Sequence, residues 1–224
     1  ALRDELRGDL CQALCGLVEL LLSSDLNSDA AALATEATPL LIEAQQYQPE
    51  SPEPHQVLAS LLVEQGKSEE ALVSLRKSLS LWYKPSSHQS NANGDDAMSE
   101  GDDDFGCGDE LPSFEFRFEA AKLVLELEED ATCAVDILER LLGENDANLD
   151  VWFLLTLAHQ GMGELEEALE CLSSAEQLLK GMSSQLQTRD GGEEGEFAEQ
   201  WLSLKTLRGD VEECLKQVNE EMES

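Results

Sequence analysis

Cysteine and histidine are the side chains most often used for metal binding and nucleophilic catalysis, and this chain has few of them in useful spacings. It contains six cysteines and three histidines among 224 residues. Cys11 and Cys15 are spaced as on one face of a helix, but no second Cys or His pair follows at zinc-finger spacing. Cys133, Cys171 and Cys214 fall at apolar helical positions, where a free thiol behaves as a small hydrophobic group. We therefore expect no metal, no cofactor and a reducing compartment.

Motifs for catalysis or ion binding are also not evident. The sequence has no Gly-rich phosphate loop, no nucleophile elbow and no His-Glu-x-x-His. Asp102 and Asp104 could begin a calcium loop, but Cys107 stands where that loop requires glycine. Ser113 stands where it requires glutamate. We expect that the protein is not an enzyme.

Carboxylates are the chemical group that the sequence provides in excess. The chain has 48 acidic and 14 basic residues, which gives a formal net charge of -34 at pH 7. Such a charge repels nucleic acid and anionic membranes, and it attracts basic partners. No apolar run approaches the roughly 20 residues that span a bilayer, and the start of the chain lacks a secretory pattern. The composition predicts an acidic, folded protein of the cytosol or nucleus.

A repeated motif indicates how these charges are positioned. Its copies begin at Gly66, Gly163 and Gly209, and each continues with two glutamates, a small residue and a leucine. A glycine free to adopt positive φ can end one helix, and glutamates favour the first turn of the next. The small residue lets two helices approach closely. Each copy therefore predicts a helix, a tight turn and a second helix.

The spacing of the small residues identifies the type of repeat. Ala134 lies 34 residues before Ala168, which is the tetratricopeptide period. A large side chain is expected 16 residues before each small one, and Phe118 and Trp152 occupy that place. His55 stands there in an earlier copy. The chain resembles tetratricopeptide-repeat proteins, and we expect an all-α solenoid of helical hairpins without strands.

The repeat units divide the chain into five expected helix pairs within one solenoid. The pairs are expected at about 1–50, 52–85, 115–148, 149–182 and 196–222. Between the second and third pairs, residues 86–113 turn to Ser, Asn, Gly and Asp, which predicts a disordered acidic insert. That insert reads either as a solvated loop or as an acidic flap for a basic partner.

The concave surface of such a solenoid is lined by the first helix of each pair, and extended peptides commonly bind there. Repeat positions that face this surface carry acids and apolar groups and no Lys or Arg, which suits a basic peptide with hydrophobic anchors. The expected partner-binding residues are Glu53, Glu64, Phe116, Glu119, Leu123, Glu126, Asp150, Phe153, Leu157, Glu196 and Glu199.

Three stretches and the acidic insert carry a narrower resemblance. The stretches run from Gln56 to Leu62, from Pro85 to Ser87 and from Glu164 to Leu169. With them the chain resembles the fungal dedicated assembly chaperones of the fourth large-subunit ribosomal protein. Members of that family bind the long basic internal loop of their client and escort it from ribosome to nucleus. The resemblance implies that client here, a place in cytoplasm and nucleus, and no direct contact with nucleic acid or membrane.

One alternative stays open at the level of sequence. An acidic tetratricopeptide scaffold or histone-type adaptor would use the same kind of groove. A co-chaperone that clamps an acidic peptide tail is disfavoured, because it needs Lys, Arg and Asn at groove positions that here contain none.

Overall fold

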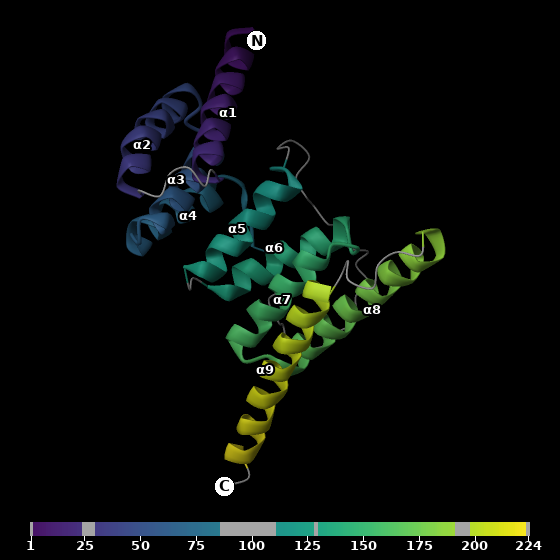
Figure 1. The fold of residues 1–224 in the computed structure, drawn as a ribbon. Helices are drawn as coiled ribbons and strands as arrows, with labels where there is room; N and C mark the ends of the chain where they lie inside the picture. Colours follow the sequence, from purple (N-terminus) through teal and green to yellow (C-terminus); the bar gives the residue numbers. More distant parts are fainter. Residues whose placement is uncertain (1, 24–29, 86–110, 128–129, 191–197, 223–224) are drawn as a thin grey trace, which may run out of the picture.

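Helices stacked in pairs make up the described parts of the chain. The computed structural model describes residues 2–23, 30–85, 111–127, 130–190 and 198–222. In chain order its helices are α1 (Leu2–Ser23), α2 (Ala30–Tyr47), α3 (Glu53–Glu64), α4 (Ser68–Trp82), α5 (Phe114–Glu126), α6 (Ala131–Glu144), α7 (Leu149–Met162), α8 (Leu165–Asp190) and α9 (Ala198–Met222). Consecutive helices pack together within each pair, and α3 contacts α1 and α5, while α5 also contacts α7 (Figure 1). The predicted tetratricopeptide-type solenoid is confirmed.

Two glycines in the left-handed region make the tight turns of the second and fourth pairs. Gly66 has φ of 68° and Gly163 has φ of 79°, values that a side chain strongly disfavours. The Gly163 N–H donates to the carbonyl of Gln160 and closes α7. Both turns lead directly into helices with two glutamates in the first turn, as the repeated motif predicts.

Polar caps fix where the central helices begin. The Ser113 hydroxyl accepts a hydrogen bond from the Phe116 N–H at 3.2 Å and starts α5. Asp130 does the same for α6 through the Thr132 N–H at 3.1 Å. The Asn148 side chain accepts from the N–H groups of residues 150 and 151 at the start of α7. Each cap satisfies donors that the first helical turn leaves without intrahelical partners.

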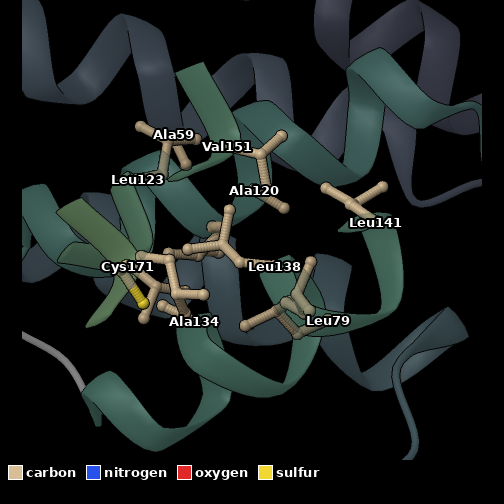
Figure 2. Close-up of a cluster of buried hydrophobic side chains, with 14 residues drawn as sticks. Ala59, Leu79, Ala120, Leu123, Ala134, Leu138, Leu141, Val151 and Cys171 are labelled. Atoms are coloured by element: carbon tan, nitrogen blue, oxygen red, sulfur yellow. The ribbon is translucent and has the colours of Figure 1, made fainter. Parts of the chain in front are cut away.

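The largest buried cluster among the described residues lies where α3 to α8 meet (Figure 2). Ala59, Ala120 and Ala134 are fully buried there, so three helices from two pairs, α3, α5 and α6, approach closely at positions without bulky side chains. Longer side chains fill the spaces between the crossings, and Phe118 and Trp152 pack at the cluster edge. The two aromatic positions therefore serve the packing role that the repeat period predicts.

The structure corrects the last predicted helix pair. In the range 196–222 a single helix, α9, runs through Gly209 without a turn. Leu204 and Leu207 precede that glycine and Val211 follows it. All three are buried against α8. A break at Gly209 would end this continuous stripe, so burial outweighs the weak helix preference of glycine, which is about 1 kcal/mol. The partner helix α8 likewise continues to Asp190, beyond the predicted end of its pair.

Most of the predicted insert, residues 86–110, lies outside the described residues. Its last residues, 111–113, are described, and they are held by the buried side chain of Arg117 on α5. Its Nε donates to the Pro112 carbonyl at 2.9 Å, and its two terminal nitrogens donate to both carboxylate oxygens of Glu144 on α6. These hydrogen bonds hold the pKa of Glu144 below its usual value. The bidentate pair fixes where the chain re-enters the solenoid.

Alanine at two glycines of the repeated motif is expected to change stability in opposite directions. Gly163→Ala should lower the free energy of unfolding by about 1 kcal/mol, because alanine is strained at positive φ. Gly209→Ala should raise it by about 0.5 to 1 kcal/mol, because this glycine is inside a helix with open space around its α-carbon. Urea denaturation followed by circular dichroism measures both. Equal destabilisation would contradict a continuous α9 and would support a turn at Gly209.

Candidate functional site

The first helices of three successive pairs, α1, α3 and α5, bring three carboxylates close together. Glu19 comes from α1, Glu53 from α3 and Glu119 from α5. Glu19 is close enough to interact electrostatically with both of the others. We call these residues the carboxylate cluster. They lie on helices that contact each other in the order α1, α3, α5, so the stacking of pairs, and not the local sequence, creates the cluster.

Like charge and partial burial make ionisation in this cluster unfavourable. The pKa of Glu53 is raised, first by burial and then by the charge of Glu19. The pKa of Glu19 is also raised, first by partial burial of its carboxylate on one side and then by the charge of Glu119. Raised pKa values of this origin indicate carboxylates without enough positive charge nearby. An incoming cation would relieve that repulsion.

Neutral contacts beneath the cluster hold its helices in place. The buried side chain of Gln56 on α3 donates from Nε2 to the Phe116 carbonyl of α5 at 2.9 Å. The Phe116 ring meets Trp82 edge-on, with centroids 6.0 Å apart. On α1, Cys15 is fully buried, and burial and then the charge of Glu53 raise the pKa of its thiol. Such a thiol is inert, so its part is packing.

One described cation lies beside the cluster on the same helix as Glu119. Lys122 Nζ is 3.2 Å from Glu119 Oε2, and both side chains are about half exposed. Exposed pairs of this kind contribute at most about 1 kcal/mol. Glu119 is therefore accessible to a more highly charged partner.

The other predicted partner-binding residues fall into two groups. Glu64, Glu126, Asp150 and Leu157 are exposed on α3, α5 and α7, and Glu199 is exposed on α9. We use the name first-helix face for one side of α1, α3, α5 and α7. It carries the carboxylate cluster together with Glu64, Glu126, Asp150 and Leu157.

Apart from Leu157, the apolar residues predicted to bind a partner are not exposed. Leu123 is only 5% exposed and belongs to the central cluster with Ala59 and Val151, so it cannot touch a partner without repacking. Phe116 and Phe153 are half-buried, and Phe153 packs against the cluster between α8 and α9. Neighbouring helices thus pack against apolar side chains that the repeat position alone assigns to the surface. Glu196 lies outside the described residues.

Glu19 is the member of the cluster that the sequence analysis missed. It stands 34 residues before Glu53, which is one repeat period. The lengthened first pair obscured that spacing, because no groove positions were assigned to it. Applying the period one unit further back would have found this residue.

Metal and membrane sites find no support in the part of the chain that the structure describes. No group of His, Cys, Asp and Glu there could hold a metal ion. Of the histidines, His159 bonds to Glu164 at 2.8 Å across the α7–α8 turn. His55 is half-buried, and burial and then Lys77 lower its pKa. The described helices include none that is long and apolar enough to cross a bilayer.

Known proteins resemble this chain in sequence and in fold. No protein-family model matches the sequence. A curated protein of Emericella nidulans, described as "Probable assembly chaperone of rpl4", is 30% identical over 129 residues. A solved structure of the assembly chaperone of RpL4, Acl4, superposes with a TM-score of 0.55 at 28% identity. The chain is similar to assembly chaperones of RpL4. The resemblance predicted from the sequence is confirmed.

The extent of the match differs between these relatives. The alignment with the curated protein covers 58% of this chain and 28% of that protein. The superposition on Acl4 covers 75% of this chain and 51% of the solved one. This chain thus spans about half or less of the relatives it matches. A MamA double mutant also superposes, over 91% of this chain and 97% of its own, with a TM-score of 0.49 and 18% identity.

The carboxylate cluster should reduce stability at neutral pH. A folded-state pKa raised above the ordinary 4.5 means that ionised Glu53 lowers the free energy of unfolding, and this loss disappears as pH falls through the raised pKa. Glu53→Gln should therefore raise the melting temperature at pH 7, and the gain should shrink toward pH 4.5. Glu64→Gln, an exposed change on the same helix, is the control for net charge. An equal gain from both variants at every pH would contradict a local effect.

Proposed function

We propose that this protein is a dedicated chaperone that binds a basic segment of ribosomal protein L4 on its first-helix face and shields it until ribosome assembly. The observation that carries the proposal is the carboxylate cluster, with the raised pKa values of Glu19 and Glu53 and its origin in three successive repeats. The similarity to assembly chaperones of RpL4 supports L4 as the client.

The energetics of the cluster favour a basic peptide as ligand. Carboxylates that repel each other in the free protein gain the most when Lys or Arg side chains arrive, because attraction is added and repulsion is relieved. The net charge of -34 extends this attraction over the surface and speeds encounter. Glu64, Glu126 and Asp150 continue the acidic surface along α3, α5 and α7. An extended client could therefore cross several repeats.

Release follows from the same electrostatics and needs no nucleotide hydrolysis. Ribosomal RNA presents phosphate charge at high density, and Lys and Arg contacts to it are strong. RNA can therefore displace a carboxylate surface from the client's basic segment. Before that transfer, the chaperone would keep the segment from binding other nucleic acids. We place this action in the cytoplasm and nucleus and assign the protein no catalytic step.

The histone-type adaptor or scaffold is the competing function, because histones are also rich in Lys and Arg. Purified L4 and purified histones H3–H4 can be compared for binding to the full chain at physiological salt. We expect a stoichiometric complex with L4 and weaker, salt-sensitive binding of histones. Tighter binding of histones would overturn the proposal in favour of the adaptor.

Neutralising the cluster should slow association with L4. The variant Glu19→Gln/Glu53→Gln/Glu119→Gln should lower the association rate about tenfold at low salt, with a weaker salt dependence, since steering acts over a Debye length of roughly 8 Å at physiological salt. Its matched control neutralises three exposed acids on second helices, Glu69, Glu70 and Glu166. Stopped-flow fluorescence measures both. Equal slowing by the two variants would mean that net charge, and not this face, guides binding.

An apolar contact should act on dissociation instead. Leu157 on α7 is 37% exposed, so Leu157→Ala removes a surface anchor and creates little internal cavity. If L4 covers it, dissociation should become about 5 to 30 times faster, which corresponds to about 1 to 2 kcal/mol, with the association rate nearly unchanged. Val73→Ala, at an exposed position on α4, is the control. Unchanged dissociation in Leu157→Ala would remove α7 from the proposed interface.

A further inference from the structure

Helix α1 has apolar residues on two sides, but only one of these sides packs against other described helices. Cys11, Cys15 and Val18 are fully buried in a cluster with residues of α2 and α3. An alanine at Gly8 would approach Gln48, just beyond α2, to 3.7 Å. These residues define the side of α1 that is packed on the solenoid.

The opposite side of α1 carries a row of exposed leucines. At 100° per residue, Leu2, Leu6, Leu10, Ala13 and Leu17 fall within an arc of about 80°. The four leucines are between 38% and 81% exposed. We call these five positions the leucine stripe. It runs from Leu2 to Leu17, about 22 Å of helix, toward the end of α1 that projects away from α5 to α9 (Figure 1).

Acidic residues follow one edge of the stripe and connect it to the carboxylate cluster. Glu5, Asp9 and Glu19 share the edge next to Leu2 and Ala13 on the helical projection, and all three are exposed. Glu19 is itself a member of the cluster. The stripe and the first-helix face are therefore adjoining parts of one acidic surface.

We propose that the leucine stripe docks an amphipathic helix of the client whose apolar face is bordered by Lys or Arg. The inference rests on the proposed function and names a second element of the same partner. Ridges of side chains on one helix pack best into the grooves of another, so a straight stripe of this length suits a helix better than an extended chain. Basic residues beside that helix would meet Glu5, Asp9 and Glu19.

Charge disfavours a second copy of this chain as the occupant. An antiparallel pairing of two α1 helices would place the acidic edge of one copy against the acidic edge of the other. A parallel pairing would bring that edge near Arg3 and Arg7 of the other copy, so the net charge of the two chains decides. Each copy also brings a net charge of -34. Repulsion of this size opposes self-association, whereas a basic client is attracted.

The test combines affinity with site-specific photocrosslinking in the full chain, with purified L4 as the probe. Leu6→Gln/Leu10→Gln should weaken L4 binding about tenfold by isothermal titration calorimetry, without changing the melting temperature, because both side chains are exposed. Val73→Gln, at a 68% exposed position on α4, should leave affinity within about twofold. A photoreactive residue at position 13 should crosslink a segment of L4 with helical apolar spacing and flanking basic residues.

The outcomes separate this inference from the proposed function. If the Glu19→Gln/Glu53→Gln/Glu119→Gln variant weakens L4 binding but the leucine variant does not, the proposed function stands and the docking of a helix on α1 is overturned. Crosslinks from position 13 to a second copy of this chain, or to an L4 segment without helical apolar spacing, also overturn it. If wild-type protein does not bind L4, both proposals fall.

Discussion

Close approach of helices at buried alanines is the constraint on which this structure depends. Ala59, Ala120, Ala134, Ala158 and Ala168 are fully buried on α3 and α5 to α8. Helix axes pack at 8–10 Å only when the residues at the crossing allow it, so larger side chains there would push the helices apart. Because the pairs stack at this distance, the first helices contact one another and their exposed residues form one surface.

That surface carries the charge that the fold itself does not need. Elsewhere the local choices agree with the architecture: glycine at positive φ ends helices, polar side chains cap them, and Arg117 forms a bidentate pair with Glu144. The carboxylate cluster does the opposite, since Glu19 and Glu53 lie partly out of water beside like charge. Departures from local consistency are expected where a protein functions, because the groups there are selected for the bound state.

Two kinds of interaction with different ranges meet on α1. Carboxylate attraction acts before contact and depends on salt, whereas leucine burial requires contact and determines how long a partner stays. Glu19 belongs to the first kind, and Leu6 and Leu10 belong to the second. Their proximity on one helix means that a single amphipathic basic segment could use both.

The sequence by itself determined the class of fold, because the turn and the period are local properties. The motifs at Gly66 and Gly163 predict the turns that the structure has, and the 34-residue spacing predicts the stacked pairs. Exposed acids such as Glu64 and Glu119 could also be assigned from repeat position alone, since surface charge needs no knowledge of neighbours.

Only the tertiary structure decided what depends on contacts between repeats. Gly209 carries the same motif as Gly163, yet burial of Leu204, Leu207 and Val211 against α8 keeps α9 continuous. Leu123 occupies a groove position of the repeat, but it is enclosed in the central cluster. Glu19 meets Glu53 and Glu119 because α1 lies beside α3 and α3 beside α5. In each case the sequence around the residue is the same whether or not another helix packs beside it. Whether the residue is in a helix, buried or close to other charges depends on segments that are distant in the chain.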